Sequence, residues 1–195
     1  DNDILKEVQK NGGEAILTSN SHKSGSDRIF EALEKLKINN VDYVLNLQGD
    51  EPNINKNDII NLNNLMVQNN SDIGTLATKI KDPSLFSNEN VVKVTLKEKL
   101  LEKNFPFALN FFRNTKSNIY KNIYHHIGVY IYKIKILEKF VNFNQTKNEI
   151  ENRLEQLRAL DNGIKINVGL AKTSPISVDT TEDYLALKKI MEYKS

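Results

Sequence analysis

Apolar residues recur along this chain in two spacings, which predict alternating helices and strands. A spacing of three to four residues predicts a helix that begins at Asp1 and stops at Gly12 and Gly13, then helices over 24–37, 57–68, 134–143, 149–160 and 181–193. Short apolar or β-branched runs predict strands over 14–18, 41–47, 73–80 and 165–171. Because helices and strands alternate, we expect an α/β fold whose sheet is mostly parallel and flanked by helices.

The segment from about residue 91 to 132 departs from this alternation. It contains β-branched and aromatic runs at 91–96, 105–112 and 125–132 with no long helix between them. Strands joined without a crossover helix pair antiparallel, so we expect a small antiparallel excursion that serves substrate binding or dimerisation. No repeat or low-complexity linker interrupts the chain, which predicts a single domain over 1–195. A helix that opens an α/β pattern usually follows a strand, so we expect an N-terminal truncation of this domain.

Composition excludes several classes of protein. The chain has 195 residues, 39% of them hydrophobic and 27% charged, which is typical of a globular protein. Its net charge of +2 gives little electrostatic attraction for nucleic acid. No apolar run approaches the ~18 residues of a membrane-spanning helix. The lack of cysteine excludes disulfides and thiolate-bound metals.

Arginine is rare among the basic residues, and this makes each arginine informative. Of the 27 basic residues only four are arginines, namely Arg28, Arg113, Arg153 and Arg158. A guanidinium group holds a carboxylate or phosphate with two parallel hydrogen bonds, which lysine cannot do. For Arg153, in a charged helix, an ordinary surface ion pair is the better interpretation.

The turn Gln48-Gly49-Asp50-Glu51-Pro52 follows the predicted strand at 41–47. In a parallel α/β sheet, ligands bind beyond the carboxyl ends of the strands, where this turn would lie. Two acidic side chains beside a glycine suit a divalent cation that carries phosphate oxygens. An acidic turn punctuated by Pro52 explains the same residues equally well.

Two further segments have both a capping and a ligand-binding interpretation. Asp179 precedes the last predicted helix and could cap it, or could join Asp50 in holding Mg²⁺, which often takes only one or two protein carboxylates. The segment from Ser24 to Arg28 could cap the helix at 24–37, or could approach a ribose or base with its backbone N–H groups. Local spacing favours capping in both cases.

Five motifs occur in order along the chain, and together they are more specific than any one of them. They are His22-x-Ser24-Gly25-Ser26-Asp27-Arg28, Asn46-Leu47-Gln48-Gly49-Asp50-Glu51-Pro52, His126-Ile127-Gly128-Val129-Tyr130, Leu154-Glu155-Gln156-Leu157-Arg158 and Val178-Asp179-Thr180-x-Glu182-Asp183. In this order and spacing they resemble the 3-deoxy-manno-octulosonate (Kdo) cytidylyltransferases, also called CMP-Kdo synthetases. The resemblance spans nearly the whole chain.

This resemblance implies a Rossmann-like nucleotidyltransferase that joins CTP to the acid sugar Kdo for lipopolysaccharide synthesis, with release of pyrophosphate. It implies Mg²⁺ as the cofactor, with metal or catalytic roles for Asp50, Asp179 and Arg113. By the same resemblance, the nucleotide would lie along Ser24, Gly25, Ser26, Arg28, Gln48 and Asp50. The sugar acid would face Arg113, His126, Glu155 and Gln156. We also expect a cytoplasmic homodimer that binds neither nucleic acid nor membranes.

Some residues depart from the family pattern, and alternatives follow from them. Ser177 stands where glycine is usual, and the residues after Arg113 differ from the family's usual run. Both changes affect the sugar side, so the substrate could be a related acid sugar, such as 8-amino-Kdo or a sialic-type acid. His126 alone would be interpreted as an interior imidazole. The family's early triphosphate-binding loop has no counterpart here, so we expect these 195 residues alone to be nearly inactive, or to act as a non-catalytic dimerisation module.

Overall fold

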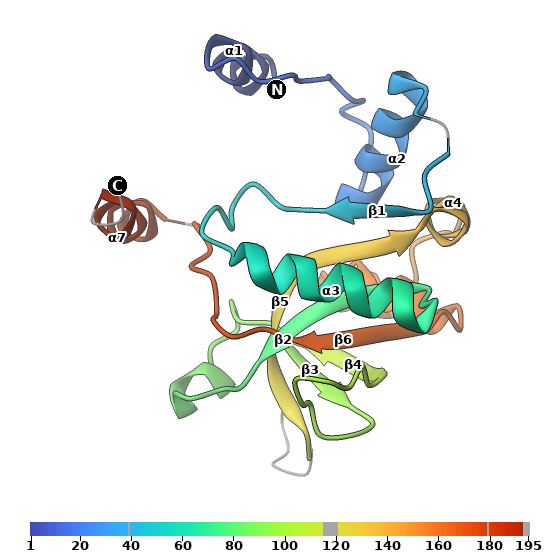
Figure 1. Cartoon of the computed structure of the whole chain (residues 1–195), viewed down its shortest axis with the longest axis vertical. Coiled ribbons are helices and arrows are strands. Elements are labelled where there is room, and N and C mark those ends of the chain that lie inside the picture. The colour runs from blue at the N-terminus through green and yellow to red at the C-terminus, as the bar shows by residue number, and fades with distance from the viewer. Residues whose placement is uncertain (39, 115–120, 179, 193–195) are drawn as a thin grey trace.

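The computed structural model describes residues 1–38, 40–114, 121–178 and 180–192 (Figure 1). The elements are α1 (Asn2–Lys10), α2 (Gly25–Leu36), β1 (Tyr43–Asn46), α3 (Lys56–Asn69), β2 (Ile73–Thr78), the short 3₁₀ helix η1 (Pro83–Phe86), β3 (Lys93–Leu96), β4 (Ala108–Phe112), β5 (Ile123–Lys133), α4 (Ile134–Val141), α5 (Lys147–Asn152), α6 (Gln156–Asp161), β6 (Ile166–Leu170) and α7 (Thr181–Glu192). Helices and strands alternate from α2 to β2 and again from α6 to α7, as the apolar spacing predicts.

The six strands form one mixed sheet, and the prediction of a mostly parallel sheet is wrong. The strands run in the order β4-β3-β5-β2-β6, and β1 pairs with β5. Only β2 and β6 are parallel, whereas β5 is antiparallel to β1, β2 and β3, and β3 is antiparallel to β4. The reason is that β5 lies between β1 and β2. These two strands keep the same direction, as the βαβ order predicts, but the long β5 separates them.

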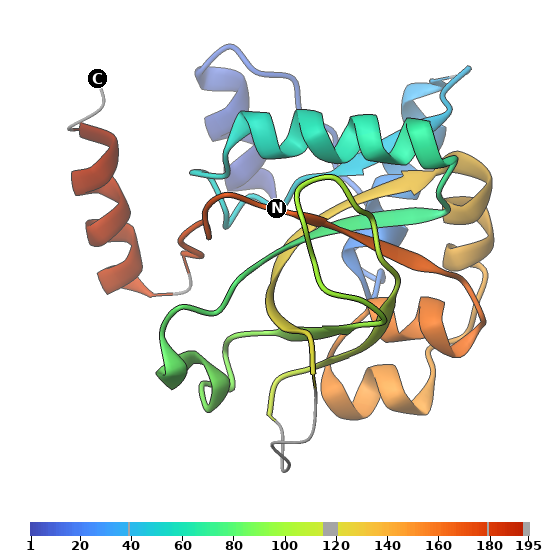
Figure 2. The same ribbon diagram turned by 60° about the horizontal axis from the view of Figure 1, so that its bottom comes forward.

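Side chains of β5 alternate between the two faces of the sheet, as expected for a strand. Ile127, Val129 and Ile131 belong to a buried cluster with Leu62 and Met66 of α3. On the opposite face, a larger cluster includes tyrosines of β5 and residues of α2, α4 and α6. Figure 2 shows α3 on one side of the sheet and α5 and α6 on the other. The sheet is therefore a central layer covered on both faces.

Two predicted elements differ in the structure. Residues 14–18 form no strand, because no strand of the described chain lies beside them; instead Ser19 N–H and the carbonyl of Leu17 bond to side chains of α2. The helix predicted over 149–160 is two helices, α5 and α6. Arg153 ends α5 with a left-handed φ of 53°, which redirects the chain.

The first and last helices lie at the periphery of the molecule (Figure 1). No residue of α1 is buried, although one of its faces is apolar. Within the described part of the chain, no helix is long and apolar enough to cross a membrane.

Candidate active site

The loop after β1 opens into a cavity of about 760 Å³ at the carboxyl end of that strand. Gln48, Asp50 and Glu51 form one wall. Other walls come from β5, from the segment 88–92 with Arg113, from residues 153–156, and from residues 174–177 with Thr180 and Asp183. A volume of this size is typical of a small-molecule site. The sheet thus brings together residues that are far apart in the sequence.

The segment after β6 returns to the loop after β1. The backbone N–H of Val178 donates to the carbonyl oxygen of Asp50 at 2.9 Å, and that of Ile176 donates to Asn53 Oδ1 at 2.9 Å. Further back, Lys172 N–H donates to Asp58 Oδ2 at 3.1 Å. Asp179, the second predicted metal ligand, lies outside the described residues. Its sequence neighbour Val178 is nevertheless fixed beside Asp50.

The two acidic side chains of the loop carry buried oxygens that find no hydrogen-bond partner among the described residues. These are Asp50 Oδ1 and Glu51 Oε2. Glu51 Oε1 accepts the backbone N–H of Gly128 at 3.2 Å. Burial raises the pKa of Glu51, and the charge of Asp50 adds to this rise, while the bond from Gly128 opposes it. Unpaired buried carboxylate oxygens are uncommon and fit a hard divalent cation such as Mg²⁺.

No group of three or more metal-ligating side chains occurs among the described residues.

Arg113 and His126 both line the cavity. The guanidinium of Arg113 donates to the carbonyls of Glu89 and Asn90, both at 3.3 Å. His126 is buried, and its Nε2 is hydrogen-bonded to Thr75 Oγ1 at 3.0 Å. Burial lowers the pKa of His126 to about 3, with a further contribution from His125. The imidazole is therefore neutral at neutral pH, and Arg113 is the cationic group of the pair.

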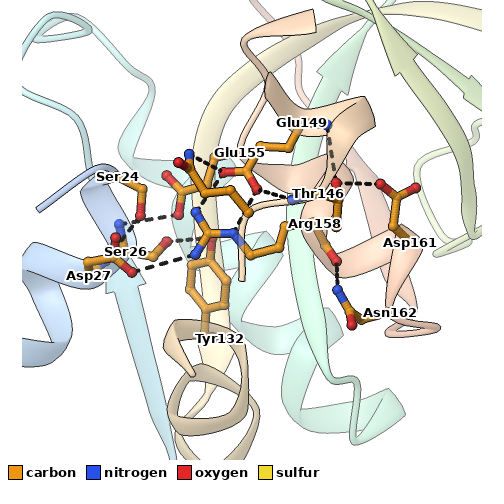
Figure 3. Close-up of polar contacts among 11 residues, drawn as sticks. Ser24, Ser26, Asp27, Tyr132, Thr146, Glu149, Glu155, Arg158, Asp161 and Asn162 are labelled. Atoms are coloured by element: carbon orange, nitrogen blue, oxygen red, sulfur yellow. Dashed lines mark hydrogen bonds and ion pairs between the residues drawn. The ribbon is translucent and has the colours of Figure 1, made fainter. Parts of the chain in front are cut away.

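Glu155 and Gln156 lie at the start of α6 and also line the cavity. Glu155 Oε1 accepts the backbone N–H of Ser26 at 3.3 Å, and Ser26 Oγ donates to the hydroxyl of Tyr132 at 3.0 Å (Figure 3). Burial raises the pKa of Glu155, while bonds from Ser26 and the charge of Arg158 oppose the rise. The sugar-side and nucleotide-side segments of the resemblance are thus directly hydrogen-bonded to each other.

Ser24, Gly25, Ser26 and Arg28 lie behind this wall. None of these four residues is among the described residues that line the cavity. Ser24 caps α2, as its local spacing predicts. The guanidinium of Arg28 donates to Thr18 Oγ1 at 3.2 Å and to the carbonyl of Ser19 at 2.8 Å. Gly25 and Ser26 adjoin residues that line the cavity, since a Cβ at Gly25 would lie 3.8 Å from Asn46 Nδ2 and Ser26 bonds to Glu155 and Tyr132. Their contact with a nucleotide remains a prediction.

Arg158 is the arginine whose role local sequence reasoning missed. Only 2% of its surface is exposed, and it forms two hydrogen bonds with Glu149, at 2.8 and 2.6 Å (Figure 3). Its Nη1 lies 3.6 Å from Asp27 of α2, and its guanidinium carbon lies 4.7 Å from the centre of the Phe140 ring. The scarcity of arginine was the sequence signal that singled out Arg158. The carboxylate that Arg158 binds is that of Glu149, and so belongs to the protein itself.

Comparisons with known proteins determine the family. The family described as Cytidylyltransferase matches residues 1–166. A 3-deoxy-manno-octulosonate cytidylyltransferase of Thermodesulfovibrio yellowstonii is 41% identical over 98% of this chain and 78% of its own length. The protein of the same name from Bartonella tribocorum is 41% identical over 97% of this chain and 78% of its own length. The chain belongs to the 3-deoxy-manno-octulosonate cytidylyltransferase family.

Solved structures agree with membership of this cytidylyltransferase family. CMP:2-keto-3-deoxy-manno-octonic acid synthetase, solved in complex with CTP, matches with a TM-score of 0.85 and 30% identity, over 100% of this chain and 79% of that one. UDP-glucose pyrophosphorylase matches with a TM-score of 0.63 at 13% identity, over 98% of this chain and 69% of that one. The second likeness shows the fold alone, which is that of an α/β nucleotidyltransferase with a mixed sheet.

Proposed function

We propose that this protein transfers CMP from CTP to the anomeric hydroxyl of Kdo, giving CMP-Kdo and pyrophosphate. The observation that carries the proposal is identity of about 40% with cytidylyltransferases of that specificity over nearly the whole chain. The cavity after β1 supports it, because acidic, cationic and amide side chains all line one site.

The reaction is an in-line substitution at phosphorus. The anomeric oxygen of the sugar forms a bond to the α-phosphorus of CTP as it loses its proton, and the bond from that phosphorus to the bridging oxygen of pyrophosphate breaks. Little covalent chemistry is required of the protein, so orientation of the two substrates and stabilisation of charge supply most of the catalysis.

Asp50 and Asp179 are the residues that would hold Mg²⁺. The unpaired Oδ1 of Asp50 supports this role, as does the bond that fixes Val178 to the Asp50 backbone. When bound, the ion would neutralise charge on the phosphate oxygens and on the leaving pyrophosphate. Gln48, with both a donor and an acceptor at the cavity wall, would then lie along the nucleotide together with the segment from Ser24 to Arg28.

Arg113 would bind the carboxylate of the sugar, and His126, Glu155 and Gln156 would contact its remaining polar groups. In a 2-keto acid sugar the carboxylate is attached to the anomeric carbon, so the residue that fixes the carboxylate also orients the attacking hydroxyl. A guanidinium group suits this planar anion. The neutral His126 and the amide of Gln156 suit uncharged hydroxyl groups.

Pyrophosphate release with CTP and a panel of acid sugars tests the proposal. The full-length protein with Mg²⁺ should release pyrophosphate with Kdo, and mass spectrometry should detect CMP-Kdo. Activity with 8-amino-Kdo or a sialic-type acid but not with Kdo would show that the substrate is that sugar instead. Ser177 lies at the cavity wall, where a departure from the family pattern would alter the choice of sugar. No release with any sugar would refute the transferase itself.

We also propose that the enzyme is a cytoplasmic homodimer, as the resemblance implies. Light scattering coupled to size-exclusion chromatography should give twice the mass of the chain, and cell fractionation should recover the protein with the cytoplasm. A monomeric mass at micromolar concentration would contradict the dimer.

A further inference from the structure

Lys93, the first residue of β3, is a fully buried cation behind the wall of the cavity. Its exposed fraction is 0%, and its ammonium donates to two backbone carbonyls, at 2.6 Å to Asn88 and 2.5 Å to Arg113. No carboxylate of the described residues forms an ion pair with it. The hydrogen-bond partners of its side chain are thus two uncharged backbone carbonyls.

Burial without an ion-pair partner is costly for an ammonium group. Burial lowers the pKa of Lys93, the charge of Arg113 lowers it further, and Glu89 only partly opposes the change. The two N–H donors of an amide could satisfy two carbonyl oxygens at much lower cost. The selection of lysine here is explained by a need for positive charge as well as for hydrogen bonds.

The two carbonyls that Lys93 binds are both connected to Arg113. One belongs to Arg113 itself, and the other belongs to Asn88, which begins the segment that binds the Arg113 guanidinium. Within that segment, the carbonyls of Glu89 and Asn90 accept from Nη1 of Arg113. Lys93 thus connects the backbone of Arg113 to the loop that orients its side chain. Asn88, Asn90 and Arg113 all line the cavity.

We propose that Lys93 is a positioning residue for the carboxylate of the acid sugar: it fixes Arg113 at the cavity wall and adds a second positive charge behind it. This inference rests on the proposed function, because it takes Arg113 as the carboxylate-binding group. The substrate's carboxylate supplies the negative charge that Lys93 lacks in the free protein. The effect of Lys93 is therefore specific to the anionic sugar and separate from the metal and triphosphate side of the cavity.

Steady-state kinetics of Lys93→Met and Lys93→Arg in the full-length protein test the proposal. Loss of a charge-assisted contact predicts a rise of about ten- to one-hundred-fold in the KM for the acid sugar with Lys93→Met, whereas the KM for CTP should stay within about threefold. Lys93→Arg keeps the charge and should recover much of the loss. Lys35→Met is the matched control, because Lys35 also donates to a backbone carbonyl, that of Leu17, away from the cavity.

A double-mutant cycle with Arg113→Lys separates positioning from a general structural role. If Lys93 acts through Arg113, Lys93→Met should raise the sugar KM far less in the Arg113→Lys background than in the wild type. Circular dichroism verifies folding, and Lys93→Gln, which can still donate to a carbonyl, replaces Lys93→Met if that variant does not fold.

A failure of this inference can be distinguished from a failure of the proposed function. A folded Lys93→Met or Lys93→Gln variant with a sugar KM within threefold of wild type overturns the inference and leaves the proposed function intact. So does an equal rise in the KM values for sugar and CTP, which would indicate a merely structural lysine. A wild-type protein that converts no acid sugar of the panel overturns the proposed function, and the inference with it.

Discussion

Val178 donates its backbone N–H to the carbonyl oxygen of Asp50, and this bond joins the loop after β1 to the segment after β6. The two residues are far apart in the sequence, and no helix or strand contains both of them. The bond fixes the main chain immediately before Asp179 beside the acidic loop. It supports the proposal that two distant carboxylates serve one cation.

Asp50→Asn should abolish turnover in the full-length enzyme while leaving the fold intact. Asparagine has the same shape but lacks the charge that Mg²⁺ requires, so we expect kcat to fall by about a thousandfold or more. The thermal midpoint should not fall, since Oδ1 of Asp50 has no hydrogen-bond partner to lose. Pyrophosphate release and a melting curve measure the two effects.

Asp42→Asn is the matched control for this substitution, because Asp42 precedes β1 at the opposite end of the same strand. It should retain wild-type activity. A wild-type rate from Asp50→Asn would show that Asp50 does not hold the metal. Asp179→Asn, which the sequence predicts to abolish turnover as Asp50→Asn does, tests the second proposed ligand of Mg²⁺.

His126 predicts an acid-sensitive contribution to stability. Its pKa is lowered from an ordinary 6.5 to about 3 by burial and by the charge of His125. Between these values the unfolded chain binds more protons than the folded one, so the free energy of unfolding should fall as the pH drops below 6.5. At pH 4.5 the loss from this residue is roughly 2 to 3 kcal/mol.

Urea unfolding at pH 7 and pH 4.5 measures this contribution, with His126→Gln as the comparison. Glutamine can still bond to Thr75 but does not titrate, so the variant should lose less stability than the wild type on acidification. An identical loss in both proteins would show that the imidazole is not responsible.

Sequence reasoning predicts the elements well and their pairing poorly. The spacing of apolar residues locates α2, α3 and β2 to within a few residues, because the two helices each turn one apolar face to the core and β2 is a continuous buried run. It cannot show that β5 lies between β1 and β2, because the order of strands depends on contacts between segments far apart in the chain. The antiparallel pairing of β3, β4 and β5 is expected from the sequence, whereas the insertion of β5 between β1 and β2 is evident only in three dimensions.

For the site, the motifs locate the residues but not their partners. Asp50, Arg113, His126, Glu155 and Gln156 line one cavity, as expected of residues that share a substrate. By contrast, Arg28 bonds to its own preceding loop. The burial of Lys93 and the pairing of Arg158 have no local signature, because each is created by packing between distant elements.

The bond between Ser26 and Tyr132 predicts a measurable coupling in stability. Ser26 Oγ donates to the buried hydroxyl of Tyr132, so Ser26→Ala leaves that hydroxyl without this partner. We expect a loss of about 1 to 2 kcal/mol in the free energy of unfolding. In a Tyr132→Phe background, Ser26→Ala should cost much less. Additive losses in the double variant, measured by urea unfolding, would exclude the coupling.

The ion pair of Arg158 with Glu149 should be worth more to the fold than any surface pair. Burial disfavours the charged form of both side chains. The hydrogen bonds between them nevertheless raise the pKa of Arg158 and lower the pKa of Glu149. Arg158→Met would leave Glu149 buried without its cation, and we expect a loss of about 3 to 5 kcal/mol. Because the pKa of Glu149 is lowered, the stability from its charged form is present above the ordinary 4.5 and is lost as the pH falls through the lower folded value.

Urea unfolding of Arg158→Met, Glu149→Gln and their combination tests this pair. Removal of both charges should cost less than Arg158→Met alone, because no unpaired carboxylate then remains buried. Lys147→Met is the surface control, since Lys147 pairs with Glu151 at 3.7 Å on the exposed side of α5 and should change stability by less than about 0.5 kcal/mol. If Arg158→Met were as mild as this control, the buried pair would contribute no more to the fold than a surface ion pair.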